Sequence, residues 1–199
     1  MKSHNAEHPP AELSRVAMAT AQAAADQGDV LERARVFATP LIAGEELDTG
    51  ENTLAHAHAV CEILQRIGGS ELMQAATYLV YACEHLTKPQ EVISKSFGDN
   101  LAALAMETTK LVRVQRQARA AQVRVGSAAP MAQTAAAQTE NIRKMLLAFS
   151  RDLRVVMLRL ASRLQTLRHY AASKLPVPAS LARESLQVFA PLEIGRAHV

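Results

Sequence analysis

The feature that most restricts the fold of this chain is the recurrence of apolar residues at every third or fourth position. This spacing is typical of amphipathic helices, and no segment shows the apolar–polar alternation of a half-buried strand. Alanine, the best helix former, accounts for 37 of the 199 residues, while aromatic residues make up only 4%. The sequence therefore predicts an all-α fold, a single helical bundle without internal repeats.

Turn and capping residues divide this pattern into separate helices. Residues 1–10 are polar and end in Pro9-Pro10, so we expect them to be disordered. We expect Thr53, Ser70 and Asp99 to cap helices, and Pro40 to end one. Residues 126–138 are small, uncharged and interrupted by a proline, which predicts a surface loop. The predicted helices cover residues 11–26, 30–40, 54–67, 71–82, 89–96, 99–125, 140–149, 151–175 and 179–192.

Two of these helices have a clear apolar stripe. In the first, the stripe consists of Leu54, Val60, Ile63, Leu64 and Ile67. In the second, it consists of Leu153, Val156, Leu160, Leu164 and Leu167. We expect both stripes to face the core, because burying such a stripe is what stabilises a surface helix.

The net charge of +3 conceals a difference between the two halves of the chain. Residues 1–107 carry 7 basic and 15 acidic side chains, a net charge of −8, whereas residues 108–199 carry 15 and 4, a net charge of +11. The basic half suits RNA or another acidic partner. We favour the alternative of two helical layers with complementary surfaces, because no aromatic residues accompany the basic ones as single-strand binding requires.

Several classes of protein are disfavoured by composition. No run of about 18 apolar residues could cross a membrane, and the N-terminus lacks the apolar core of a secretory signal. Two cysteines do not make a disulfide framework in a chain of this length. We therefore expect a reduced, cytoplasmic protein.

Residue spacing alone does not identify an active site. His56 and His58 lie about 200° apart around a helix, and Cys83, Glu84 and His85 are consecutive, so a helix directs them to different sides. A zinc centre needs three or four converging ligands, and the chain has no CxxC or HExxH motif. Neither Cys61 nor Cys83 has an activating neighbour, and there is no glycine-rich phosphate loop. From spacing alone, these residues are most simply explained as buried or half-buried parts of a core.

Four segments together resemble a known family. They are GENTLAHAHAVCEILQRIGG, YLVYACEHL, SKSFGDNLAALAMETTKLVRV and LRVVMLRLASRLQTLRHY. In this order and spacing they resemble the N-terminal hydrolase-type (HD) domain of RelA/SpoT-type guanosine tetraphosphate enzymes. The ending ESLQVFAPL resembles the helix that leads into their synthetase domain. The similarity covers roughly residues 30–192.

The resemblance implies a position for each metal ligand of the active family members. Those members hold manganese with a His in an HP segment, an adjacent His-Asp pair and a later Asp in LADRLHN, and they release the 3′ pyrophosphate of the alarmone. Only the first His and the Glu of a following Glu-Asp pair are retained. The corresponding positions are His56 for the first His, Val80 and Tyr81 for the His-Asp pair, Glu84 and His85 for the Glu-Asp pair, and Ser162 for the later Asp, with Gln165 and Thr166 in place of the nearby His and Asn.

The resemblance therefore implies a hydrolase-type domain that has lost its metal. One imidazole cannot hold a hard cation, so we expect no catalytic, cofactor-binding or metal-ligating residue and no cofactor. This pattern is similar to the monofunctional synthetase (GTP pyrophosphokinase) branch. In that branch the degenerate domain is a regulatory partner of the synthetase domain, whose activity responds to stalled ribosomes carrying uncharged tRNA. The implied partners are thus the synthetase domain, the ribosome and uncharged tRNA, with no membrane.

The expected organisation follows from this resemblance. We expect an N-terminal extension at 1–29, a degenerate hydrolase-type domain at 30–180 with a flexible loop at 120–138, and the start of a linker helix at 181–192. Residues 193–199, EIGRAHV, depart abruptly from the family pattern and match a common sequencing-library adapter read in frame. We expect these seven residues to be an artefact at the end of a truncated fragment.

Two alternatives remain open. The first is a divergent hydrolase that binds metal through His56, Glu84, His85 and Cys83. The second is a standalone helical adaptor that binds RNA through its basic C-terminal half, with an affinity that falls steeply with salt.

Overall fold

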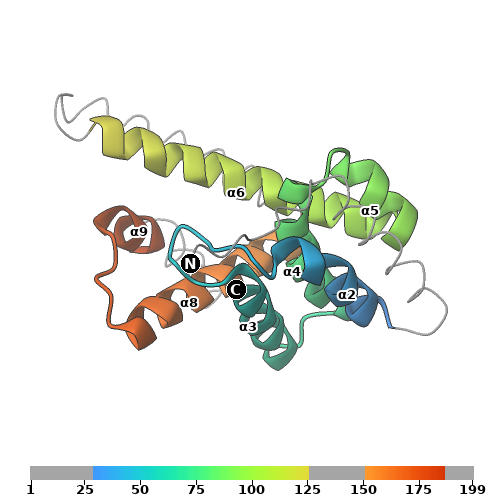
Figure 1. Ribbon diagram of the computed structural model, residues 1–199. Helices are drawn as coiled ribbons and strands as arrows, with labels where there is room; N and C mark the ends of the chain where they lie inside the picture. The colour runs from blue at the N-terminus through green and yellow to red at the C-terminus, as the bar shows by residue number, and fades with distance from the viewer. Residues whose placement is uncertain (1–28, 126–150, 187–199) are drawn as a thin grey trace, which may run out of the picture. The chain divides into compact units, whose positions relative to one another are not determined.

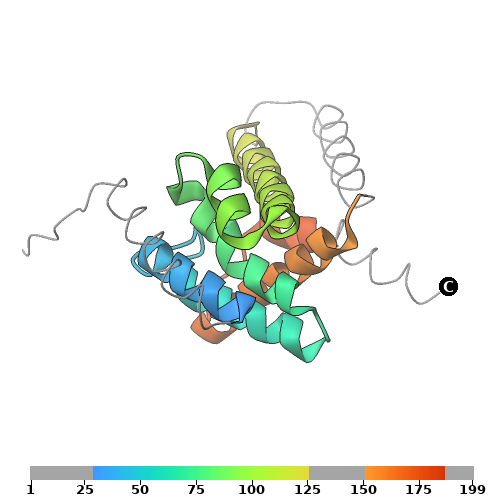
Figure 2. The same cartoon turned by 90° about the vertical axis from the view of Figure 1, so that its right-hand side faces the viewer.

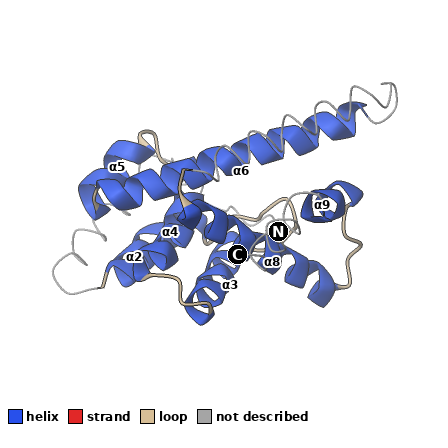
Figure 3. Cartoon of the chain, turned by 180° about the vertical axis from the view of Figure 1, so that it is seen from behind, coloured by secondary structure: helices blue, strands red, loops and turns tan. Residues whose placement is uncertain are grey.

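The computed structural model describes residues 29–125 and 151–186. The predicted helices at 11–26 and 140–149, most of the predicted loop and the segment 193–199 lie outside the described residues. Within the described ranges every named element is helical, and the only β-type pairing is one isolated bridge between Glu46 and Asn52 (Figure 3). The all-α prediction is confirmed. None of the described helices combines the length and hydropathy that a bilayer crossing requires.

The chain divides into two compact units, Met1–Met106 and Glu107–Val199, which are described separately. The described part of the first unit contains α2 (Val30–Ile42), α3 (Thr53–Arg66), α4 (Glu71–Ala82), the 3₁₀ turn η1 (Cys83–His85), α5 (Pro89–Phe97) and the start of α6 (Asp99–Val125). Helix α4 packs against both α2 and α3 (Figures 1 and 2).

Because α4 has neighbours on two sides, almost all of its side chains are buried. The buried residues of α4 are Met73, Ala75, Ala76, Thr77, Tyr78, Leu79, Val80 and Ala82. A helix that is apolar around most of its circumference belongs in a core rather than on a surface. Positions 80 and 81, where the resemblance places the His-Asp pair, lie in the last turn of this central helix.

Polar side chains set the starts of the helices. Asn52, not Thr53, caps α3: its side-chain oxygen accepts a hydrogen bond from the amide of Ala55 at 3.0 Å, and Thr53 is the first helical residue. Both Asn and Thr can cap a helix, and the cap of α3 lies one residue earlier than predicted. Ser70 caps α4 as predicted, accepting from the amide of Met73 at 3.4 Å.

Several helix boundaries differ from the predictions, among them those at Pro40 and Asp99. Helix α2 continues through Pro40 to Ile42, because the proline lies in the last turn and the closing bond from the Ala43 amide to the Thr39 carbonyl (2.9 Å) spans it. Asp99 is the first residue of α6 rather than its cap. Helix α6 ends at Val125, where the predicted helix at 99–125 also ends, and its residues 120–125 overlap the start of the flexible loop expected at 120–138.

Helix α2 is tied to the end of α5 by an arginine and two aromatic rings. Arg33 donates a hydrogen bond to the carbonyl of Ser96, and its guanidinium lies 5.3 Å from the centre of the Phe97 ring. The rings of Phe37 and Phe97 meet edge to face, with centroids 5.5 Å apart. These contacts give the C-terminal carbonyls of α5 a donor and cover one side of the Phe97 ring.

The described part of the second unit contains the rest of α6, α8 (Leu153–Ser173) and α9 (Ala179–Glu184). The predicted apolar stripe of α8 is only partly correct, since Leu153 and Leu164 are 59% and 41% exposed. A different and more polar face is buried instead. The buried residues of α8 are Val155, Val156, Leu158, Arg159, Ala161, Ser162, Arg163 and Tyr170.

A side-chain hydrogen bond explains how this face of α8 accommodates an arginine. Arg159 donates from Nε and Nη2 to the side-chain oxygen of Gln115 in α6, at 3.0 and 2.5 Å. A buried guanidinium needs such acceptors to offset the loss of water. The periodicity of leucines alone did not indicate this polar contact.

Candidate functional site

His56, which the resemblance places at a metal-ligand position, lies in the first turn of α3. Its imidazole is almost completely buried, with 1% of the side chain exposed, and Nδ1 lies 2.6 Å from a carboxylate oxygen of Glu51. The Glu51 side chain is 8% exposed. The sequence analysis did not identify Glu51, although a carboxylate just before the helix cap and five residues before a histidine was a usable signal.

Glu51 is positioned by the loop between α2 and α3. Its carbonyl accepts from the amide of Leu47 at 2.9 Å, and its amide donates to the hydroxyl of Thr49 at 3.3 Å. The following residue, Asn52, donates from its side-chain nitrogen to the carbonyl of Ala43 at 2.8 Å while capping α3. The loop backbone is thus held on both sides of the Glu51 carboxylate.

The positions of the His-Asp pair carry side chains without metal-binding groups. Val80 is buried, 6% exposed, and offers only hydrocarbon. The ring of Tyr81 lies edge to face against His56, with centroids 5.6 Å apart and planes at 86°. The Tyr81 ring therefore lies against His56. The resemblance expects the carboxylate of the His-Asp pair at this position, and the chain has an aromatic ring there instead.

The other predicted residues of the first unit are spread over the turn η1. Cys83 is buried, and its thiol lies 3.9 Å from the sulfur of Met106. Glu84 is exposed and His85 is half-buried. Three successive residues of a 3₁₀ turn point in different directions, because each residue advances by about a third of a turn.

The remaining predicted position, Ser162, lies in the second unit. Its side chain is on the buried face of α8, 9% exposed, and its carbonyl accepts from the hydroxyl of Thr166 at 3.0 Å. Gln165 and Thr166 are half-buried. A serine hydroxyl is neutral, so this position supplies no carboxylate to a hard cation.

The donor set does not fit the manganese that the family resemblance implies. Among residues 29–125 and 151–186 no group of three or more His, Cys, Asp or Glu side chains could hold a metal ion. His56 keeps its imidazole, but Val80 and Tyr81 replace its two expected neighbours with an aliphatic group and a neutral phenol. A single imidazole does not hold a hard divalent cation, so the residues at these positions do not fit the metal.

The other histidine of α3 belongs to a separate cluster. A hydrogen bond of 2.8 Å links the Tyr78 hydroxyl to Nδ1 of His58, and the two rings meet edge to face. Burial raises the pKa of the Cys61 thiol and that of the Tyr78 hydroxyl above their ordinary ranges. Cys61 is therefore a neutral thiol near pH 7, which is the opposite of an activated nucleophile.

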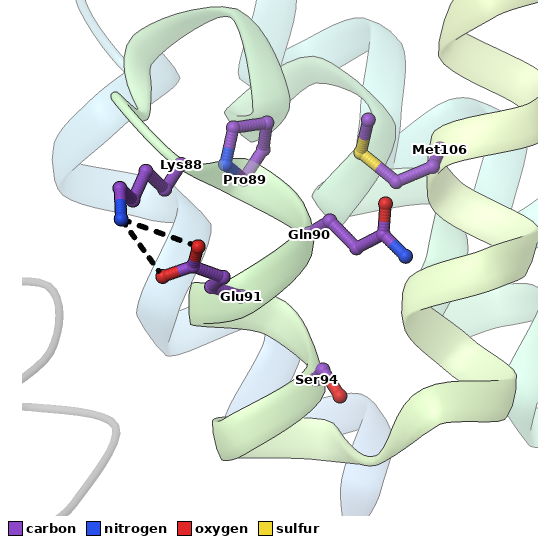
Figure 4. Close-up of a pocket in the computed structure, with 6 residues that line it drawn as sticks. All are labelled: Lys88, Pro89, Gln90, Glu91, Ser94 and Met106. Atoms are coloured by element: carbon purple, nitrogen blue, oxygen red, sulfur yellow. Dashed lines mark hydrogen bonds and ion pairs between the residues drawn. The ribbon is translucent and has the colours of Figure 1, made fainter.

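A cavity of about 520 Å³ lies between the start of α5 and α6 (Figure 4). Its lining residues are Lys88, Pro89, Gln90, Glu91, Ser94 and Met106, and Lys88 pairs with Glu91 at 3.2 Å. The side chains of Gln90 and Met106 point toward one another in Figure 4. None of the predicted site residues lines this cavity, so its location does not support a role in the family's chemistry.

Comparison with known proteins agrees with this fold. The HD domain family matches residues 34–198. The chain is 34% identical over 160 residues to a probable guanosine-3′,5′-bis(diphosphate) 3′-pyrophosphohydrolase of Synechocystis sp., an alignment that covers 80% of this chain and 19% of that protein. It is 29% identical over 167 residues to a GTP pyrophosphokinase of Myxococcus xanthus, covering 82% and 20% of the two chains.

A third relative gives the same picture. A probable GTP pyrophosphokinase of Mycobacterium leprae is 32% identical over 172 residues, covering 85% of this chain and 20% of that protein. The chain belongs to the HD domain family, and its relatives identify it as an HD domain of the RelA/SpoT type. It spans about a fifth of the length of the curated relatives it matches.

Proposed function

We propose that this chain is a catalytically inactive HD domain that regulates a (p)ppGpp synthetase of the monofunctional, GTP pyrophosphokinase type. The observation that carries the proposal is the pair Val80 and Tyr81 in the last turn of α4. One is a buried aliphatic side chain and the other an aromatic ring against His56. The relatives carry both hydrolase and pyrophosphokinase names, so the proposal depends on these ligand positions rather than on the names.

The loss of the ligand positions removes the chemistry that a hydrolase needs. Metal-assisted hydrolysis requires a cation that lowers the pKa of a bound water. Ser162 adds a neutral hydroxyl where the resemblance expects the last carboxylate, so three of the four ligand positions lack a suitable donor. Glu51 and His56 contact each other within the first unit. Val80 and Tyr81 of α4 add no metal-binding group beside them.

The role proposed for the domain is therefore regulatory. The longer protein would transfer pyrophosphate from ATP to GTP or GDP, and this domain would bias that activity by contacting the synthetase domain of the same chain. The ribosome and uncharged tRNA are the further partners proposed for the longer protein. Such regulation requires only that the contact differ in free energy between two states of the synthetase.

A direct test is to incubate the purified chain with guanosine tetraphosphate and Mn²⁺ and measure pyrophosphate release. We expect no release above the rate without protein, and no stoichiometric manganese by metal analysis. The Synechocystis relative, assayed in parallel, provides the positive control. Manganese-dependent turnover that His56→Ala abolishes would show that the domain is an active hydrolase.

A restored variant gives the complementary test. The substitutions Val80→His, Tyr81→Asp, His85→Asp and Ser162→Asp return the three altered ligand positions, and the altered residue of the Glu-Asp pair, to the family's residue types. We expect this variant to bind Mn²⁺ and to gain thermal stability when the metal is added, because a ligand that binds only the folded state stabilises it. The same variant carrying His56→Ala is the matched control and should bind Mn²⁺ much more weakly.

A divergent hydrolase is the second candidate, favoured by the name of the Synechocystis relative. It would bind metal through His56, Cys83, Glu84 and His85. The contacts give it little support, because the Cys83 thiol lies against the Met106 sulfur and Glu84 is exposed. Stoichiometric zinc or manganese in the unmodified chain would favour this candidate over the inactive domain.

The RNA-binding alternative depends on the charge of residues 108–199. One of its basic residues, Arg154, forms an ion pair with Asp152 at 2.7 Å, and Lys110 pairs with Glu107 at 3.0 Å. These pairs reduce the charge available to phosphates. The alternative stays a prediction, tested by whether RNA affinity falls steeply with salt concentration.

A further inference from the structure

The side of α8 that faces away from its buried residues is apolar. Five residues on this side are half-buried or exposed and follow one another at steps of four and three: Leu153, Met157, Leu160, Leu164 and Leu167. Each exposed leucine lies two residues, about 200° around the helix, from a buried residue, Leu153 from Val155 and Leu164 from Ser162. We call these five residues the α8 stripe.

The α8 stripe reverses the usual arrangement of a surface helix. Within the described helix, the only exposed side chains between positions 153 and 167 are Leu153 and Leu164, whereas Arg159 and Arg163 are buried. A surface helix normally places its charged residues outside and its leucines inside. Single exposed leucines are ordinary, but an apolar stripe of roughly 21 Å, at 1.5 Å per residue, is typical of a surface that another molecule covers.

The spacing of the α8 stripe favours a second helix as the covering molecule. Steps of four and three are the spacing of a coiled-coil seam, in which the side chains of one helix pack between those of another. A helix that lies on a membrane instead combines its apolar face with a strongly polar face that stays in water. The other side of α8 is buried, so it has no such face.

The charge around the α8 stripe indicates the sign of that helix. Residues 151–186 carry 7 basic and 2 acidic side chains, a net charge of +5. Arg168, four residues after Leu164, is exposed, and so is Lys174 at the end of α8. Neither forms an ion pair with another described residue. Carboxylates on the covering helix would therefore meet cations that have no acidic partner.

A second copy of this chain fits the α8 stripe less well. Two α8 helices would bring their cations together, and like charges at an interface cost free energy. The acidic residue at the start of α8, Asp152, already pairs with Arg154 at 2.7 Å. The anionic side chains that would complement this surface must come from a different sequence.

We propose that the α8 stripe is a docking surface for an acidic amphipathic helix of a protein partner. Apolar residues of that helix would pack between the leucines of the stripe, and its carboxylates would pair with Arg168 and Lys174. The inference goes beyond the proposed function, and it does not depend on whether the domain hydrolyses guanosine tetraphosphate.

A synthetic heptad-repeat peptide is the probe for this surface. It carries leucine at the a and d positions and glutamate at e and g, and a comparison peptide carries lysine at e and g. In fluorescence anisotropy at low salt, we expect the whole chain to bind the acidic peptide at least about tenfold more tightly than the basic one. Equal affinities, or no binding of either peptide, would overturn the proposal.

Substitutions locate the bound peptide. Leu164→Ser should weaken binding of the acidic peptide about tenfold, because a buried leucine anchor is lost. Ile67→Ser is the matched control, since Ile67 is a large apolar residue of the first unit that is 54% exposed, and it should leave the affinity unchanged. Arg168→Glu should weaken the acidic peptide and strengthen the basic one, a reversal that loss of structure does not produce. An affinity that Leu164→Ser leaves unchanged would refute the assignment to α8.

Two further results would assign the α8 stripe to a different occupant and refute the proposal. One is a dimer of this chain in light scattering that Leu164→Ser dissociates. The other is sedimentation with vesicles of phosphatidylserine and phosphatidylcholine that Leu164→Ser abolishes. Circular dichroism of each variant verifies that the helices are retained.

Discussion

The side chain of Asn52 joins the loop before α3 to the first turn of that helix. Asn52→Ala should show how much these bonds contribute to the free energy of unfolding. The side chain makes three bonds: it accepts from the Ala55 amide at 3.0 Å and donates to the carbonyls of Ala43 and Glu45 at 2.8 and 3.3 Å. The substitution removes all three without creating a cavity, because the side chain is exposed.

The expected magnitude follows from these bonds. Losing an N-terminal cap typically costs about 1 kcal/mol. Each donated bond adds a net contribution of about 0.5 kcal/mol, the low end of the usual range, because water can replace an exposed partner. We therefore expect Asn52→Ala to lower the free energy of unfolding by about 2 kcal/mol, the sum of these terms.

Asn52→Asp separates the two contributions. An aspartate keeps the accepting oxygen and places a negative charge at the N-terminus of α3, which is favourable, but it cannot donate to the two carbonyls. We expect a loss of about 1 kcal/mol or less, measured by urea denaturation followed by circular dichroism.

The two variants together decide whether the capping argument is correct. If Asn52→Ala changes the free energy of unfolding by less than about 0.5 kcal/mol, the cap contributes nothing beyond what water supplies, and the argument fails. If Asn52→Asp is as destabilising as Asn52→Ala, the donated bonds dominate and the cap is unimportant.

Two further predictions concern packing and pH. Gly69→Ala should lower the free energy of unfolding by about 1–3 kcal/mol in urea denaturation. The reason is that an added Cβ would lie 3.0 Å from the carbonyl oxygen of the buried Leu64. Gly44→Ala is the control and should be neutral, because a Cβ there has no atom within 4 Å. The raised pKa values of Cys61 and Tyr78 mean that the folded chain keeps protons that the unfolded chain releases, so stability is fully present below about pH 8.5 and falls as the pH rises above it. The double variant Cys61→Ala with Tyr78→Phe should lose less stability between pH 7 and pH 10.5, and an equal loss would contradict the assignment.

The fold was predictable where local chemistry and burial agree. Ser70 begins α4 because its hydroxyl is the nearest acceptor for an unpaired helix amide, and nothing in the tertiary structure opposes that choice. The apolar stripe of α8 shows the opposite case. Burial of Arg159 depends on Gln115, which is 44 residues away in the chain, and no periodicity within one helix reports such a partner.

The site was predictable only as far as residue identity could be transferred. The resemblance located His56, Val80 and Tyr81, and the structure brings the ring of Tyr81 to His56. Glu51 was missed because its role arises from a loop whose bonds lie between residues 43 and 52, rather than from a motif of ligands. Its spacing from His56 was a signal in the sequence, but the contact itself depends on the path of that loop, which turns the carboxylate toward the start of α3.

The burial of Val80 on the central helix has an evolutionary consequence. Once an isopropyl group is packed there, returning an imidazole alone puts a polar group into a dry core at a cost of about 1–3 kcal/mol, before any metal can offset it. The benefit of metal binding appears only when several ligands are present together. Under the proposed loss of the ligands, each single reversion lowers stability without restoring metal binding, so the site cannot be rebuilt one residue at a time.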